Sequence, residues 1–210
     1  MFAHKPIIGI VGGIGSGKSY VAKLFGELGC RVISSDEQVK QLYDDPRVRD
    51  ALRQWWGDDV IGGDGAVNKR AIAQRVFADP AERARLEQLL HPLVNDARVR
   101  QMESAANDPR IVAYIWDTPL LLEAGLHAQC DAVVFVDAPL ETRLDRVRRT
   151  RNWDAAELAR RENLQQGLDT KREMSDHVIN NSADVDYARR QVREVLSRIL
   201  ARTNKQSDPA

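Results

Sequence analysis

Short runs of apolar residues alternate along the chain with longer segments in which apolar residues recur at helical spacing. Five runs are predicted strands: 7–11, 31–34, 111–116, 132–136 and 177–179. Three of them, 7–11, 111–116 and 132–136, are almost wholly apolar, as expected for strands that are buried on both faces. The alternation predicts an α/β fold with a five-stranded parallel sheet and helices on both faces.

Apolar stripes indicate two helices clearly. The first is predicted to end at Gly29, and the last is predicted to begin with Asp186 as its N-cap. The stripe residues are Tyr20, Val21, Leu24, Phe25 and Leu28 in the first helix and Val192, Val195, Leu196, Ile199 and Leu200 in the last. A third apolar helix is predicted to close at His91-Pro92. A lone histidine there is more often a capping or satisfied residue than a catalyst.

Two segments interrupt the alternation. Residues 37–108 carry little strand signal and are predicted to form an inserted helical region, whereas 141–171 is rich in arginine and is predicted to form a lid. Ligands of α/β sheets gather at the carboxyl ends of the strands, where long connections form lids and pockets. Residues 1–36 and 109–202 then make up the core. The polar tail 203–210 is predicted to be disordered.

The stretch GIVGGIGSGKSY, residues 9–20, carries the clearest chemistry. Gly12, Gly17, Lys18 and Ser19 fit G-x-x-x-x-G-K-[ST], in which backbone N–H groups cradle phosphates. Lys18 would reach the β- and γ-phosphates, and the Ser19 hydroxyl would ligate Mg²⁺. A strand precedes this loop and a helix follows it, so we expect it to bind a nucleoside triphosphate. The predicted nucleotide-binding residues are Gly13, Ile14, Gly15, Ser16, Gly17, Lys18, Ser19 and Tyr20.

Two carboxylates follow predicted strands, and each has two interpretations. Asp36 comes directly after 31–34, where it can accept the proton of an attacking hydroxyl or cap the next helix. Asp117 ends the run at 111–116, where it can hold Mg²⁺, directly or through water, or serve as a turn residue. The residue types and their spacing leave both choices open.

Five arginines are crowded into the predicted lid, at positions 143, 146, 148, 149 and 151. A run of charge is usually a solvated face. In a phosphate-binding fold, however, cations are needed over the migrating phosphoryl group. We therefore expect one or two of these arginines to have a functional role.

The amino-acid composition restricts the kinds of binding partner and the cellular location that we expect. The chain of 210 residues has 31 basic and 31 acidic residues, a balance that argues against general nucleic-acid binding. It has two widely separated cysteines, Cys30 and Cys130, and thus no disulfide framework. There is no signal-peptide core and no apolar run near the ~18 residues of a membrane span. We expect a cytoplasmic monomer or weak homo-oligomer without nucleic-acid or membrane partners.

The motifs together resemble those of the dephospho-CoA kinase family. Besides the P-loop, four stretches carry the resemblance: DGAVNKRAIAQRVFADP, LEQLLHP, DTPLLLE and RRENLQQGLDTKREMSDHVINN. The resemblance extends from about Ile7 to Asn181. The chain departs from the family pattern at Ser34 and Ser35, where Asp and Ala are usual. One extra residue in the arginine cluster leaves open whether Arg146 or Arg151 is the lid arginine.

The resemblance implies an adenylate-kinase-like P-loop core, an insertion that binds the CoA moiety, and transfer of the γ-phosphoryl of ATP to the ribose 3′-hydroxyl of dephospho-CoA. It makes Asp36 the base and assigns charge stabilisation to Lys18, Arg146 and Arg151. The substrate-binding residues expected are Asp36, Arg70, His91, Leu120, Glu123 and Arg161, with Ser19 and Asp117 for Mg²⁺. The alternatives are another P-loop kinase of nucleosides or nucleotides and a nucleotide-responsive binding module.

Overall fold

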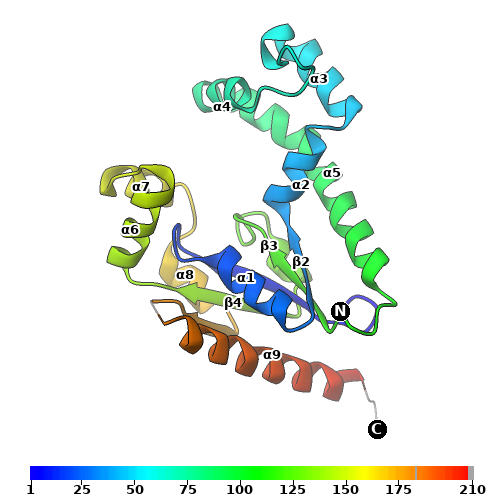
Figure 1. Cartoon of the computed structure of the whole chain (residues 1–210), viewed down its shortest axis with the longest axis vertical. Coiled ribbons are helices and arrows are strands. Elements are labelled where there is room, and N and C mark those ends of the chain that lie inside the picture. Colours follow the sequence, from blue (N-terminus) through cyan, green and yellow to red (C-terminus); the bar gives the residue numbers. More distant parts are fainter. Residues whose placement is uncertain (183, 208–210) are drawn as a thin grey trace. The chain divides into compact units, whose positions relative to one another are not determined.

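The computed structural model describes residues 1–182 and 184–207, and the chain divides into two compact units. The first unit consists of Met1–Ser34 and Met102–Ala210, and the second of Ser35–Gln101 (Figure 1). The insertion predicted over 37–108 therefore includes residues 102–108, which belong to the first unit.

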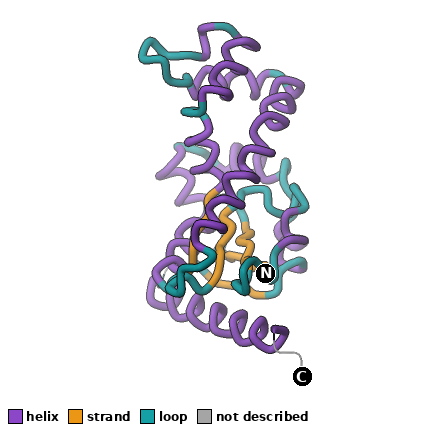
Figure 2. Tube along the Cα trace, turned by 90° about the vertical axis from the view of Figure 1, so that its right-hand side faces the viewer, coloured by secondary structure: helices purple, strands orange, loops and turns teal. Residues whose placement is uncertain are grey.

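A parallel sheet of five strands in the order β2-β3-β1-β4-β5 forms the centre of the first unit. Its strands are orange in Figure 2. The strands are β1 (Ile7–Gly12), β2 (Cys30–Ser34), β3 (Ala113–Asp117), β4 (Ala132–Asp137) and β5 (His177–Asn180). All five predicted strands are confirmed, with ends that differ by a residue or two. Every residue of β1 and β3 is buried, which explains their unbroken apolar character.

Helices α1 (Lys18–Glu27) and α9 (Val185–Ser207) contribute to the core on one face of the sheet. Their buried residues, among them Phe25 and Val192, pack with alternate strand residues such as Ile115. On the other face the Tyr114 hydroxyl donates to the carbonyl oxygen of Met102 at 3.1 Å. Alternation along β3 thus supplies side chains to both layers.

Three helices lie between β4 and β5 and carry the predicted lid: α6 (Leu140–Arg151), α7 (Ala155–Glu162) and α8 (Leu168–Glu173). A small apolar cluster joins α6 and α7 to the glycine-rich loop. It contains Ile14, Leu144, Val147, Trp153 and Leu158. The loop and the lid helices therefore share a core. A short 3-10 helix, η2 (Leu126–Gln129), precedes β4.

The second unit is built from α2 (Ser35–Leu42), α3 (Pro46–Trp56), η1 (Asp58–Val60), α4 (Lys69–Ala78) and most of α5 (Pro80–Ala105). Among the residues described here, this unit contains helices and loops but none of the five strands. Its core consists of Leu42, Val48, Leu52, Trp56, Val60, Val67, Ile72, Leu86, Leu90 and Val94.

The prediction that an apolar helix closes at His91-Pro92 is wrong. Helix α5 continues through Pro92 to Ala105, and the boundary between the units falls within it. An internal proline costs about 3 kcal/mol, because it removes one helical hydrogen bond. Leu86, Leu90 and Val94 keep a buried stripe on both sides of Pro92, and this packing offsets the cost.

Both ends of α9 differ from the prediction. The carboxylate of Asp184 accepts hydrogen bonds from the backbone N–H groups of Asp186 and Tyr187, so Asp184 caps the helix in place of Asp186. The helix also includes residues 203–207 of the predicted tail. Within this part of the helix, Thr203 is buried and its hydroxyl donates to two carbonyl oxygens of the preceding turn. Residues 208–210 of that tail lie outside the described residues.

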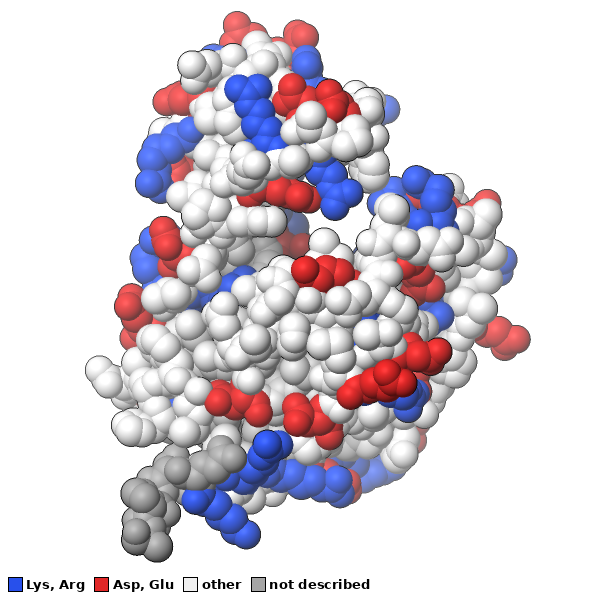
Figure 3. All heavy atoms as spheres, turned by 180° about the vertical axis from the view of Figure 1, so that it is seen from behind, with Lys and Arg blue, Asp and Glu red and all other residues white. Residues whose placement is uncertain are grey.

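Acidic and basic side chains are interspersed on the face shown in Figure 3, and basic ones gather along the edge formed by α9. Within the described part of the chain, no helix combines the length and the apolar character needed to cross a membrane.

Candidate active site

The glycine-rich loop joins the central strand β1 to α1. Gly15 and Gly17 have φ values of +77° and +92°, which glycine adopts most readily. A Cβ at Gly15 would lie 2.7 Å from the carbonyl oxygen of Arg143, and one at Gly17 would overlap the side-chain amide of Asn181. Helix α6 and the segment after β5 thus press against the loop, and both positions require glycine.

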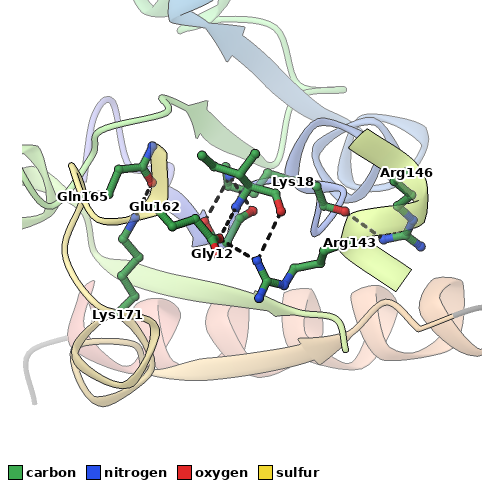
Figure 4. A network of polar contacts seen from close by, with 10 residues as sticks. Gly12, Lys18, Arg143, Arg146, Glu162, Gln165 and Lys171 are labelled. Carbon is green, nitrogen blue, oxygen red and sulfur yellow. Dashed lines mark hydrogen bonds and ion pairs between the residues drawn. The ribbon is translucent and has the colours of Figure 1, made fainter. Parts of the chain in front are cut away.

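Donors outside the loop bind its carbonyl groups (Figure 4). The guanidinium of Arg146 donates to Ser16 O at 2.9 Å, to Gly15 O at 3.3 Å and to Asn181 O at 2.9 Å. The Asn181 amide also donates to Ser16 O, at 2.7 Å. The first N–H groups of α1 have no intrahelical acceptor, and the helix dipole adds positive potential there. This arrangement suits an anion at the loop.

Lys18 is a partly buried cation at the start of α1. Its Nζ donates to Gly12 O at 3.0 Å and to Gly13 O at 3.1 Å. Burial, and secondly the nearby Lys171 ammonium, lower the pKa of Lys18 from 10.5 to about 8. An anion beside Nζ would stabilise the charged form, so this site favours a phosphate electrostatically.

Lys171, on α8, is a second cation near the loop, and it is buried, with 2% of its surface exposed. Its Nζ lies 3.2 Å from Oε1 of Glu123. It also donates to Oε1 of Gln165 at 2.9 Å (Figure 4). Burial acts to raise the pKa of Glu123, but hydrogen bonds from backbone N–H groups and the Lys171 ammonium together lower it. Glu123 therefore serves as the counter-ion of Lys171 in the segment after β3. Leu120, in the same segment, is partly exposed.

Two predicted lid residues stack on one aromatic ring. The guanidinium groups of Arg161 and Arg151 lie 4.3 and 4.8 Å from the centroid of the Trp153 ring. Arg151 also contributes to the lowered pKa of Lys18, after burial and Lys171, so its charge acts at the phosphate loop. Arg146, by contrast, donates to backbone carbonyl groups.

Asp117 and Ser19 supply oxygen atoms near the loop. Asp117 is buried at the end of β3, where it is in register with Ile10 of β1, and its charge acts to raise the pKa of Lys18. Ser19 is exposed in the first turn of α1. Mg²⁺ takes a few protein oxygens and completes its shell with water and phosphate oxygens. The types of donor at Asp117 and Ser19 fit that requirement.

Three predicted site residues belong to the second unit. Helix α2 begins at Ser35, so Asp36 lies within its first turn rather than at the capping position. Arg70 is on α4 and His91 is on α5, and both are exposed. The roles predicted for them stay predictions.

The sequence assigned no role at this site to Glu162, Lys171 or Asn181, which all touch its residues. Lys171 and Asn181 lie within the last stretch of the family resemblance, and that was the signal that could have found them. Glu162 lies in the same stretch, but a glutamate in an arginine-rich helix looks like a solvated charge.

The chain is similar to known proteins over most of its length. The family described as dephospho-CoA kinase matches residues 6–187. Curated dephospho-CoA kinases from Syntrophotalea carbinolica and Deinococcus radiodurans are 33% and 34% identical, with 92% and 93% of both chains covered.

Two solved structures resemble this chain. A crystal structure from Thermus thermophilus has a TM-score of 0.77 at 31% identity, covering 93% of this chain and 98% of that one. Dephospho-CoA kinase from Campylobacter jejuni has a TM-score of 0.69 over 94% and 98% of the two chains. At 19% identity, the second likeness is evidence for the fold alone.

Proposed function

The chain belongs to the dephospho-CoA kinase family, and from this premise we propose that it transfers the γ-phosphoryl group of ATP to the ribose 3′-hydroxyl of dephospho-CoA. The products are coenzyme A and ADP. The observation that carries the proposal is the P-loop on the central strand, whose Lys18 lies among further cations. That arrangement suits a polyphosphate, and the family supplies the acceptor.

The reaction needs charge stabilisation and a proton acceptor. Loop N–H groups and Lys18 bind the phosphates, and Arg151 stabilises the charge on the migrating group. The 3′-oxygen forms a bond to the γ-phosphorus as the bond to the ADP oxygen breaks. Asp36 accepts the hydroxyl proton.

Bound Mg²⁺, held by Ser19 and Asp117, would neutralise phosphate charge. We also propose that Arg70, His91, Leu120, Glu123 and Arg161 contribute to binding dephospho-CoA. A cytoplasmic location, a monomeric or weakly associating state and the lack of nucleic-acid partners stay predictions.

An acceptor panel tests the proposal. The purified protein with ATP and Mg²⁺ is assayed against dephospho-CoA, adenosine, AMP and shikimate, with ADP release and the phosphorylated product both measured. We expect turnover with dephospho-CoA far above that with the other three. Turnover of another acceptor without turnover of dephospho-CoA would overturn the proposal.

ATP affinity is expected to fall as pH rises through about 8. Lys18 has a pKa of about 8, and a bound polyphosphate would raise that pKa, so ATP binding takes up a proton in this range. The phosphates, with a second pKa of about 6, are already fully ionised there. Calorimetry at pH 8.5 in two buffers of different ionisation enthalpy measures the proton uptake.

The control for this prediction is Lys18→Arg. A guanidinium stays charged throughout this range, so the pH dependence should disappear in the variant. An equal pH dependence in both proteins would assign the titration to another group.

Arg146→Lys and Arg151→Lys are expected to impair different properties of the protein: the first its stability and ATP binding, the second its kcat. Arg146→Lys removes donors from three backbone carbonyl groups. It should cost about 1–3 kcal/mol of folding free energy and weaken ATP binding. Arg151→Lys should keep the melting temperature and lower kcat by roughly tenfold or more. Thermal unfolding, ATP binding and kcat compare the two, and the reverse pattern would make Arg146 the phosphoryl ligand.

A further inference from the structure

Glu162, the last residue of α7, places its carboxylate against the phosphate loop (Figure 4). Its Oε1 accepts hydrogen bonds from the backbone N–H of Ile14 at 3.1 Å and from Nη1 of Arg143 at 2.5 Å. A Cβ at Gly13 would lie 2.9 Å from the same Nη1 and 3.1 Å from the same Oε1. The absence of a side chain at Gly13 thus lets this ion pair lie directly on the loop.

Arg143 is almost completely buried, with 5% of its surface exposed. A guanidinium at that depth requires an anion, because desolvation disfavours an unpaired charge. Glu162 supplies that anion. The Nε of Arg143 is also buried, and among the described residues it has no hydrogen-bond partner. The guanidinium can therefore still donate a hydrogen bond to a second oxygen.

The two donors converge on one oxygen position, and a phosphate oxygen suits that position as well as a carboxylate oxygen does. A loop N–H and a guanidinium are the usual partners of phosphate in proteins. Among the charges that act on Lys18, Glu162 and Asp117 raise its pKa, whereas Lys171 and Arg151 lower it. Phosphate oxygens beside Lys18 would therefore lie near the Glu162 carboxylate and repel it.

We propose that Arg143 and the Ile14 N–H form a subsite for one oxygen of the ATP polyphosphate, and that Glu162 competes with ATP for this subsite. On binding, the phosphate oxygen takes both donors, and the Glu162 carboxylate turns toward solvent. Its side chain is already 22% exposed. Glu162 then stabilises the fold while it weakens nucleotide binding. The inference rests on the proposed function only in requiring that the chain bind ATP.

The test is Glu162→Gln, with ATP binding measured by calorimetry and unfolding measured without nucleotide. Glutamine keeps the size of the side chain but loses the charge, so it holds Arg143 more weakly and does not repel phosphate. We expect ATP to bind about five- to tenfold more tightly, while the melting temperature falls. These two changes have opposite signs, which a purely structural role does not produce. A lower melting temperature with unchanged or weaker ATP binding would overturn the proposal.

Arg143→Met is expected to weaken ATP binding at least tenfold, and the gain from Glu162→Gln should shrink in that background. Asp145→Asn is the matched control. It removes one carboxylate from a lid helix, where Asp145 pairs with exposed Arg149, and it should leave ATP affinity unchanged. An equal gain in affinity from Asp145→Asn would assign the effect to net charge and overturn the proposal.

If Glu162→Gln does not fold, Glu162→Asp replaces it. The shorter side chain cannot reach the Ile14 N–H, so ATP should again bind more tightly, and unchanged affinity would count against competition. Dephospho-CoA turnover by the wild type separates the two proposals. Normal turnover without tighter binding by the Glu162 variants refutes only the competition, whereas a wild type that binds no ATP refutes the proposed function.

Discussion

We expect Asp36→Asn to turn over dephospho-CoA about 10²–10⁴-fold more slowly than the wild type, with nearly unchanged affinity for ATP. Asparagine has the size of aspartate and keeps a hydrogen-bond acceptor, but it cannot take the proton of the 3′-hydroxyl. Asp36 is exposed in the first turn of α2, two residues after β2 ends. Steady-state kcat and KM with dephospho-CoA, together with calorimetric ATP binding, measure both parts of the expectation.

Glu37→Gln is the matched control, because Glu37 lies next to Asp36 in the same exposed turn and loses the same charge. A carboxylate near a helix N-terminus contributes about 0.3–1 kcal/mol, so both variants should unfold at slightly lower temperatures. Only Asp36→Asn should lose turnover. Near-normal turnover by that variant would remove Asp36 from the mechanism, and equal losses in both variants would assign the effect to the helix.

Three strands, β1, β3 and β4, could be predicted because burial on both faces leaves a local signal. Runs such as 7–11 and 132–136 are almost wholly apolar, and their short length favours buried strands over helices. Helix ends depended on tertiary packing instead. Pro92 is typical of a helix end, but α5 continues through it because Leu90 before it and Val94 after it are buried. Asp184 and Asp186 are chemically equal as caps, and only the backbone geometry selects Asp184.

The candidate site, too, has a part that the sequence predicts and a part that depends on tertiary packing. The P-loop is one continuous segment whose glycines and Lys18 act through local backbone, so the sequence contains the whole motif. The five arginines of the lid are alike in sequence, and their contacts depend on which side of α6 faces the loop. Arg146 binds carbonyl groups and Arg143 pairs with Glu162 across 19 positions of the chain, which no local pattern encodes.

Lys18→Met is expected to abolish most activity and yet to raise the melting temperature. Methionine keeps the unbranched stem but removes the ammonium, so phosphate charge is no longer stabilised, and kcat/KM should fall by roughly 10²–10³-fold. The loss should apply to every acceptor, so slow hydrolysis of ATP by water should fall by a similar factor. In Asp36→Asn, by contrast, transfer to dephospho-CoA falls and transfer to water is spared.

The gain in stability follows from the sign of the pKa shift. Burial and Lys171 lower the pKa of Lys18 to about 8, so the fold disfavours its charged form, and below pH 8 the folded state bears that full penalty. Methionine removes the penalty, and the difference in melting temperature from wild type should shrink as pH rises from 8 toward 10.5. Lys23→Met, at an exposed position of α1, is the control and should change neither activity nor stability appreciably. A Lys18→Met variant that unfolds below wild type at pH 7 would show that the ammonium stabilises the loop through its bonds to Gly12 and Gly13 by more than its burial costs.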